Sequence, residues 1–466
     1  MSSKHKYLAK NMGLFSISCF LPKLLSFLLV PIYTSYLTTA EYGISDLLST
    51  TVLLLIPVFT LDIQDAVMRF ALDDKYKKED VFSVSLRIIL IGTGLICIGA
   101  YIISRVTSLG IEDSYLTYFV LMYFTTAFCN SVSLFCRGID KVNVMVVGGI
   151  LQTVITLFAN IIFLVVLEWG LTGYLLANVI GNVLGLFWYF FGAKLYRYIR
   201  WSVTKGVLKD MVIFSFPLIF SVIAWWINSA SDRYILSWMT GVAVSGLYAV
   251  SYKIPSILST FQNIFYQAWS ISAIKEFDKN DSDGFISNTY NMMNFIMVLA
   301  CSGIMIANIP LAKILYSKEF FTAWKFVPPL LISVVFNAMA LFVGSIFTAV
   351  KDTKTLSVST VIGALVNTVC NFILIYYWEA YGAAVATMLG YVTVLLIRIV
   401  ILRKHVTLQV KWWRDGLVYI LLVVQMVVAA RGMKYVLLQI MVMLTILILY
   451  TKEFRQIILS ARRRVL

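Results

Sequence analysis

Apolar runs about twenty residues long recur from one end of this sequence to the other, separated by short polar stretches. A run of that length matches an α-helix that crosses the hydrocarbon core of a membrane. The composition agrees, because 60% of the 466 residues are hydrophobic and only 13% are charged. We therefore predict an all-α polytopic membrane protein. Its predicted spans, about fourteen, cover residues 12–37, 44–69, 81–104, 115–136, 144–167, 172–195, 211–238, 247–273, 286–309, 325–350, 356–378, 382–402, 416–431 and 433–450.

The formal net charge of +15 is spread over many short loops rather than gathered in one patch, which argues against a nucleic-acid partner. When the N-terminus is placed in the cytoplasm, 26 of the 38 Lys and Arg residues lie in cytoplasmic segments and 6 in outer segments. Because positive charge collects in the cytoplasmic loops of membrane proteins, the sequence predicts that both termini are cytoplasmic.

The cysteines and histidines offer no metal chemistry. The six cysteines lie within or at the ends of apolar runs and form no CxxC pair, and the two histidines lie in basic polar segments. We therefore expect no metal site, no disulfide framework and no cofactor.

An internal repeat is visible about 200 residues apart. Asn160 and Glu168 recur as Asn371 and Glu379, and a set of small residues recurs after a two-residue slip. This set is Gly173, Ala177 and Gly181, repeated as Gly382, Ala386 and Gly390. Each copy holds an even number of spans, so the copies enter the membrane in the same direction as parallel repeats. The predicted domains are an N-lobe with spans 1–6, a C-lobe with spans 7–12, and spans 13–14 with a basic cytoplasmic tail, covering residues 1–205, 206–410 and 411–466.

Charged residues within the spans are the first candidates for function, because each costs on the order of 3 kcal/mol at the centre of a helix. Apart from Arg87, those we single out lie in spans 1, 2, 7 and 8, which the repeat symmetry is expected to bring together at the interface between the lobes. They are Lys23, Asp46, Asp62, Asp65, Arg69, Arg87, Asp232, Arg233 and Lys253.

The cationic members of this set are suited to an anionic substrate such as a pyrophosphate or an acidic sugar. We predict substrate contacts for Lys23, Arg233 and Lys253. Arg69 is a further candidate, although it lies four residues after Asp65, a spacing that favours an ion pair within the helix. Arg233, which directly follows Asp232, has internal pairing as its alternative role.

The acidic members are candidates for binding a coupling ion, either Na⁺ or H⁺. Carboxylate and amide oxygens suit a small hard cation. We place the predicted cation site at Asp232 with Asn228, Asn367 and Asn371, and keep Asp62 and Asp65 as further candidates. Proline breaks helices around cavities in transporters. Pro57 and Pro255 stand at matching points of the repeats, so we predict that both are hinges.

The N-terminal segment carries three short motifs. They are Asn11-Met12-Gly13-Leu14-Phe15, Val30-Pro31-Ile32-Tyr33-Thr34, and Leu37-Thr38-Thr39-Ala40-Glu41-Tyr42-Gly43 followed by Asp46-Leu47. Together they resemble the N-terminal signature of bacterial polysaccharide flippases in the multidrug/oligosaccharidyl-lipid/polysaccharide exporter superfamily. The resemblance implies two six-helix lobes around a cationic cavity in the bacterial cytoplasmic (inner) membrane. It also implies alternating access that moves an undecaprenyl-pyrophosphate-linked oligosaccharide to the outer leaflet for surface polysaccharide such as the O-antigen of lipopolysaccharide.

Other functions remain open at this point. A membrane oligosaccharide polymerase or ligase is one alternative, but such enzymes need a sizeable outer loop with catalytic residues, and the outer segment around 310–324 offers only Glu319 as an acid. A drug/cation antiporter of the same superfamily is the other alternative, supported by Asp62, Asp65 and Asp232. We therefore predict a transporter rather than an enzyme. Its expected partners are a lipid-linked oligosaccharide, membrane lipids, and a polysaccharide polymerase with its chain-length regulator.

Overall fold

The computed structural model describes residues 23–106, 113–451 and 453. In these ranges the chain forms helices and no strand. Ten of the described helices are long and apolar enough to cross a membrane, and shorter apolar helices cover Val242–Ser251 and Met433–Leu449. The prediction of an all-α polytopic membrane protein is confirmed.

The chain divides into two compact units, Met1–Ala230 and Ser231–Leu466. The helix α9 (Lys205–Thr240) runs through the boundary. In the first unit residues 23–28 are helical and lead into α2 (Val30–Tyr36), α3 (Thr39–Phe59), α4 (Ile63–Ala71), α5 (Lys78–Val106), α6 (Asp113–Gly138), α7 (Val142–Asn160), η1 (Ile161–Val166), α8 (Gly170–Gly192) and η2 (Leu195–Tyr198). The second unit continues with α10 (Val242–Ser251), α11 (Pro255–Lys275), α12 (Phe285–Leu315), η3 (Lys318–Lys325), α13 (Val327–Ala349), α14 (Thr353–Leu402), α15 (Trp412–Ala429), η4 (Met433–Tyr435) and α16 (Val436–Leu449). The three predicted domains stay a prediction.

The start of α3 follows from its first residues. Thr38 accepts a hydrogen bond from the backbone N–H of Glu41 (3.2 Å), and the Glu41 carboxylate accepts one from the backbone N–H of Thr38 (2.8 Å). This capping box satisfies two N–H groups that a helix start leaves without partners. Thr38 and Glu41 of the third N-terminal motif therefore serve to start α3. The first motif, Asn11–Phe15, lies outside the described residues.

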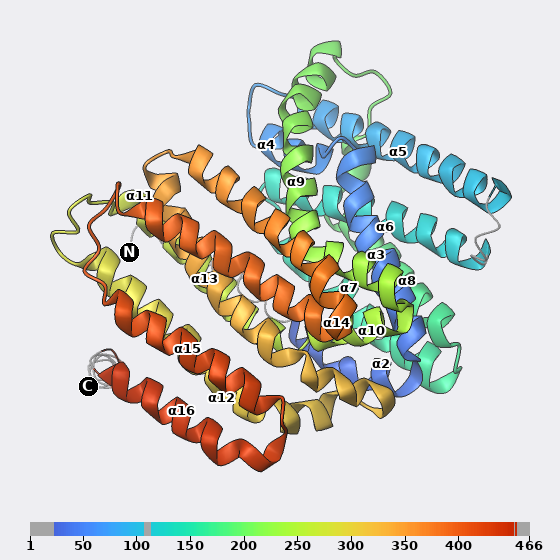
Figure 1. Cartoon of the computed structure of the whole chain (residues 1–466). Coiled ribbons are helices and arrows are strands. Elements are labelled where there is room, and N and C mark those ends of the chain that lie inside the picture. Colours follow the sequence, from blue (N-terminus) through green and yellow to red (C-terminus); the bar gives the residue numbers. More distant parts are fainter. Residues whose placement is uncertain (1–22, 107–112, 452, 454–466) are drawn as a thin grey trace, which may run out of the picture. The chain divides into compact units, whose positions relative to one another are not determined.

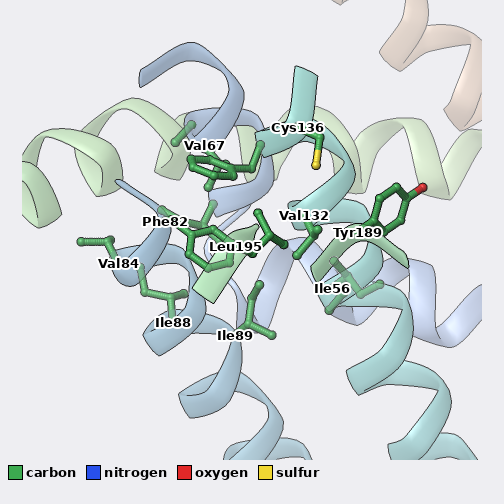
Figure 2. Packing of buried hydrophobic residues seen from close by; sticks show 14 of the residues in the cluster. Ile56, Val67, Phe82, Val84, Ile88, Ile89, Val132, Cys136, Tyr189 and Leu195 are labelled. Atoms are coloured by element: carbon green, nitrogen blue, oxygen red, sulfur yellow. The ribbon is translucent and has the colours of Figure 1, made fainter. Parts of the chain in front are cut away.

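Buried apolar side chains from α3, α4, α5, α6 and η2 form the core of the first unit (Figure 2). The rings of Phe82 and Phe135 lie 4.8 Å apart, and Leu195 of η2 is buried in the same cluster. Because η2 begins where the last predicted span of the N-lobe ends and contacts α5 and α8, its buried leucine fixes the chain to this core before α9 begins.

Two of the predicted spans are broken rather than continuous, which corrects the boundaries predicted from the apolar runs. Span 2 is split into α3 and α4 by Leu61 and Asp62, which have φ values of 53° and 49°. Span 8 is split into α10 and α11 just before Pro255, which stands at the first position of α11. The breaks lie near Pro57 and at Pro255, where a missing N–H and the pyrrolidine ring disfavour a continuous helix.

The repeat predicted from the sequence has a structural counterpart in two helical hairpins. In the first unit α7 and α8 meet where Gly181 lies against Thr156, and in the second unit the halves of α14 meet where Gly390 lies against Asn367. α14 turns at Glu379, the residue with non-helical angles inside it (φ 48°, ψ −129°), and Glu168, its repeat partner, has φ 53°. Both copies therefore cross at a small residue and turn at an equivalent glutamate.

Within the second unit, a buried polar network joins the last two helices to α12. Figure 1 shows α15 and α16, drawn in red, running beside α12. Arg414 of α15 binds the carboxylate of Glu453 (2.8 Å) and the side-chain oxygen of Asn291 on α12 (2.7 Å). The hydroxyl of Tyr450 donates to Asp415 (2.8 Å), and the Arg414 guanidinium lies 4.0 Å from the centre of the Tyr450 ring.

We expect Gly382→Ala to destabilise the protein by about 1–3 kcal/mol, the range for overpacking a tight contact. A Cβ at Gly382 would lie 2.1 Å from the backbone oxygen of Leu374, so one helix of the α14 hairpin has to shift. Thermal unfolding in a mild detergent measures the effect. Gly303→Ala in α12 is the matched control, because nothing lies within 4 Å of its added Cβ. Equal melting temperatures for the two variants would contradict the close crossing.

Candidate functional site

Asp232 of α9 lies at the centre of a buried hydroxyl cluster in the second unit. Its side chain is 4% exposed. Its Oδ2 atom accepts hydrogen bonds from the hydroxyls of Tyr248 (2.6 Å), Tyr252 (3.0 Å) and Thr387 (3.3 Å). Its Oδ1 atom accepts one from the backbone N–H of Arg233 (2.9 Å). These directed donors offset the cost of burying the polar oxygens of the carboxylate in an apolar environment.

Two amides of the α14 hairpin extend this cluster. Asn367 approaches Thr387 with its Nδ2 atom 3.5 Å from the hydroxyl, and Asn371 donates to the side-chain oxygen of Asn367 (3.1 Å). The side-chain oxygen of Asn371 is buried and has no hydrogen-bond donor. A buried carbonyl oxygen without a donor costs about 1–3 kcal/mol, and a bound cation would satisfy it.

The donor set suits a monovalent hard cation. It combines one carboxylate with hydroxyl and amide oxygens, which are ligands for Na⁺-like ions rather than for soft transition metals. No group of three or more His, Cys, Asp or Glu side chains able to hold a metal ion occurs in the described part of the chain. The structure thus places Asp232 and Asn367 next to Thr387, and Asn371 next to Asn367. The side chain of Asn228 lies outside the described residues.

Sequence reasoning missed three members of this cluster, namely Tyr248, Tyr252 and Thr387. The two tyrosines are four residues apart and so share one face of a helix, a spacing that was visible in the sequence. Thr387 directly follows Ala386, one of the small residues of the repeat, but a lone threonine in an apolar span gave no signal.

The cationic candidates in this unit are Arg233 and Lys253. Arg233 lies beside the cluster in the structure, and Lys253 follows one of its members in the sequence. The Arg233 guanidinium carbon lies 5.1 Å from the centre of the Tyr252 ring, within cation–π range. Lys253 is the residue after Tyr252, at the break between α10 and α11, and its side chain is half-buried.

The remaining cationic candidates belong to the first unit. Lys23 is exposed in the helical segment 23–28. Arg69 is exposed and lies 3.8 Å from Asp73, just beyond the end of α4, rather than pairing with Asp65 as predicted. The acidic partner of Arg69 is therefore Asp73 rather than Asp65. An exposed pair of this kind stabilises a helix by less than about 1 kcal/mol.

The two acidic candidates of the first unit differ from each other. Asp62 is fully buried at the break between α3 and α4, where its backbone N–H donates to the carbonyl of Pro57 and its Oδ1 atom accepts from Gln64 (3.3 Å). Asp65, on the next turn, is exposed. Of these two carboxylates only Asp62 has the burial expected of an ion-binding residue.

Arg398, in the second half of α14, is a buried cation that our set of span charges overlooked. It is 6% exposed and donates to the carbonyl of Ala340 (2.6 Å) and to the hydroxyls of Ser359 (3.0 Å) and Thr360 (3.0 Å). Because it ties both halves of α14 to α13 through neutral acceptors, we assign it a structural role.

Comparisons with known proteins agree with this fold. A family model described as "Polysaccharide biosynthesis protein" matches residues 8–270, more than half of the chain. No curated protein matches the sequence. A solved structure described as lipid II flippase MurJ in an inward closed conformation is 13% identical, with a TM-score of 0.69, over 96% of this chain and 99% of that chain.

Two further solved structures share the fold with lower TM-scores. An inward-facing multidrug resistance MATE family transporter of the MOP superfamily is 14% identical, with a TM-score of 0.67, over 88% of this chain and 98% of that chain. A MOP superfamily transporter from Pyrococcus furiosus is 16% identical, with a TM-score of 0.57, over 85% of this chain and 95% of that chain. The chain is therefore a multi-pass membrane protein that belongs to the polysaccharide biosynthesis protein family and has the fold of MOP-superfamily transporters.

Proposed function

We propose that this protein is a flippase that moves an undecaprenyl-pyrophosphate-linked oligosaccharide from the cytoplasmic to the outer leaflet of the bacterial inner membrane by alternating access. The product would feed surface polysaccharide synthesis, of the O-antigen of lipopolysaccharide or a related polymer, through a polymerase and a chain-length regulator. The distribution of Lys and Arg supports a cytoplasmic position for both termini.

The observation that carries this proposal is membership of a polysaccharide biosynthesis family in a chain with a transporter fold. The solved structure with the same fold over nearly its whole length is described as a flippase for lipid II. Lys23, Arg233, Lys253 and Arg69 supply the positive charge that a lipid pyrophosphate requires. Because the fold is shared with transporters, transport is favoured over the polymerase or ligase alternative.

We further propose that Asp232, with Asn367, Asn371 and Thr387, binds the ion that drives transport, either Na⁺ or H⁺. Burial of the carboxylate and the unsatisfied oxygen of Asn371 support this role. Asp62 and Asp65 are the competing carboxylates, of which the exposed Asp65 is the weaker one.

The second candidate function is drug/cation antiport. The buried Asp232 favours it, because an acidic residue inside a span attracts cationic substrates, and so does the fold shared with a multidrug resistance transporter. Antiport predicts that loss of the protein raises the accumulation of a cationic dye such as ethidium without changing the outer-leaflet lipid-linked oligosaccharide.

The decisive experiment measures lipid-linked oligosaccharide in the outer leaflet of cells that lack the protein and carry a rescuing variant. We expect wild type to restore translocation and Lys23→Ala with Lys253→Ala to lower its rate about tenfold, since removing two phosphate contacts, one of them exposed, costs roughly 1.4 kcal/mol. The control is Lys351→Ala with Lys354→Ala, two exposed lysines at the start of α14.

Membrane levels of all variants are compared by immunoblot. Translocation that proceeds normally without the protein, while ethidium accumulates, would replace the flippase assignment by the antiporter. Translocation that proceeds normally while polymer growth stops would favour the polymerase.

A further inference from the structure

Tyr252 belongs at once to the candidate cation site and to the break in the eighth predicted span. Its hydroxyl donates to Asp232 of α9 (3.0 Å). Its backbone carbonyl accepts from the N–H of Ser256 (2.9 Å) and so begins α11, while α10 ends at the preceding residue, Ser251. A side chain tied to the carboxylate is therefore attached to the joint between two half-helices.

We propose that Tyr252 transmits cation occupancy at Asp232 to the joint between α10 and α11, and through its ring to Arg233, an inference that rests on the proposed cation-coupled transport. The partner is a monovalent hard cation. Tyr252 acts here as a positioning residue that links the ion site to the two cationic side chains proposed to hold the lipid pyrophosphate.

The first step is the competition between hydroxyl hydrogens and a cation for the same oxygen. Oδ2 of Asp232 accepts hydrogen bonds from Tyr248 and Tyr252, and the third hydroxyl near it, that of Thr387 (3.3 Å), has the closer carbonyl of Ala383 (3.1 Å) as an acceptor for its single hydrogen. A carboxylate oxygen presents about two lone-pair positions, so this atom has no position left for a cation. A bound cation repels these hydrogens and needs the lone pairs to which they point. At least one hydroxyl therefore has to release Asp232 when the ion binds.

Of the two tyrosine hydroxyls on Asp232, that of Tyr252 is the one to release it. Its oxygen lies 2.9 Å from the hydroxyl oxygen of Tyr248, which can accept the Tyr252 hydrogen once that hydrogen leaves Asp232. Its bond to Asp232, at 3.0 Å, is also longer than the 2.6 Å bond from Tyr248. Turning the Tyr252 hydrogen towards Tyr248 frees a lone pair for the cation and removes the tie between the joint and α9.

The second step is the response of Arg233. Its guanidinium lies over the Tyr252 ring at 5.1 Å, so a displacement of the ring changes the environment of this charge directly. Lys253 shares the joint with Tyr252 and is carried along by any movement of its backbone. Ion binding and anion binding are thereby linked, and linkage between two ligands is reciprocal.

Thr387 is the control for this role, because Tyr248 supplies the oxygen to which the Tyr252 hydrogen turns. The Thr387 hydroxyl lies 3.3 Å from Oδ2 of Asp232, on α14, which is not part of the joint. Replacing Thr387 by valine changes the ion site but keeps the Tyr252 hydroxyl, the Tyr248 acceptor and the tie between the joint and Asp232.

The test compares wild type, Tyr252→Phe and Thr387→Val as full-length protein in lipid nanodiscs. Hydrogen–deuterium exchange of the peptide 250–258 is measured in NaCl and in N-methylglucamine chloride at equal ionic strength. Binding of undecaprenyl pyrophosphate is measured in the same two salts. In wild type we expect Na⁺ to change the exchange rate of this peptide at least about threefold and to shift the dissociation constant of the lipid by a similar factor, within the usual range of coupling energies.

Tyr252→Phe is expected to lose both Na⁺ responses even at saturating Na⁺, whereas Thr387→Val keeps them at a shifted Na⁺ affinity. Equal Na⁺ responses in the two variants would overturn the role of Tyr252, and so would the absence of a Na⁺ response in wild type. Lipid binding and translocation by wild type without any Na⁺ response would refute the coupling and leave the flippase standing. A Tyr252-dependent Na⁺ response in a protein that moves no lipid-linked oligosaccharide would support the coupling and refute the flippase.

Discussion

Asp232→Asn is expected to reduce ion-stimulated transport on the order of 100-fold, equivalent to about 2.7 kcal/mol. The substitution keeps the size of the side chain and an oxygen that accepts hydrogen bonds. It removes the negative charge, whose attraction for a cation at 4 Å is about 4 kcal/mol at an effective dielectric constant of 20 before the cost of dehydrating the ion. The measurement is the initial rate of lipid-linked oligosaccharide flipping in proteoliposomes, with and without a Na⁺ or proton gradient.

The control is Asp74→Asn, which makes the same change at an exposed loop position. Transport by this variant should match wild type. Asp62→Asn is measured in parallel, because Asp62 is the competing buried carboxylate. If Asp62→Asn abolishes the gradient dependence while Asp232→Asn retains it, the ion site belongs to the first unit and our assignment is wrong.

Arg414→Met is expected to destabilise the protein by about 3–5 kcal/mol, the cost of leaving buried charges without their partner. Glu453 and Asp415 are both buried beside Arg414, at 2.8 Å and 3.3 Å from its nitrogens. Without the guanidinium these two buried carboxylates lose their positive partner, and α15 loses its hydrogen bond to Asn291 of α12. Thermal unfolding in detergent, with protease protection of the C-terminal helices, measures the change.

Arg431→Met at an exposed position just after α15 is the control and should change stability by less than about 0.5 kcal/mol. Arg414→Lys separates charge from geometry, because lysine keeps the charge but cannot hold Glu453 and Asn291 with one planar fork. A melting temperature of Arg414→Met equal to that of Arg431→Met would show that the network adds nothing to stability.

The helices could be predicted because hydrophobicity alone decides which segments leave water. Their interruptions could not. Pro57 was visible, yet the break that follows it lies at Leu61 and Asp62, whose positive φ values are imposed by the packing around them rather than by their own preference. Glu379 is a similar case, since its spacing from Glu168 indicated a repeat, but a turn made by one residue was not predictable from its side chain.

The candidate site was predictable where it depended on charge and less so where it depended on hydroxyls. Asp232 stood out because a carboxylate in an apolar span is costly, and the amides Asn367 and Asn371 stood out for the same reason. Tyr248 and Thr387 belong to residue types that are common in spans, so only the three-dimensional arrangement identifies them as partners of Asp232. The partner of Arg69 was wrong because two aspartates, Asp65 and Asp73, lie four residues from it, and helical spacing alone cannot choose between them.

The single-residue turn in α14 has a consequence for how the chain enters the membrane during synthesis. The two halves of this 50-residue element are joined at Glu379 without a loop, and they touch along their length, from Gly382 beside Leu374 to Arg398 beside Ser359. If the first half of α14 crossed the membrane alone, no loop would be available to connect it to a second half that was still in the aqueous phase. We therefore expect the two halves of α14 to enter the bilayer together, as a helical hairpin, rather than one after the other.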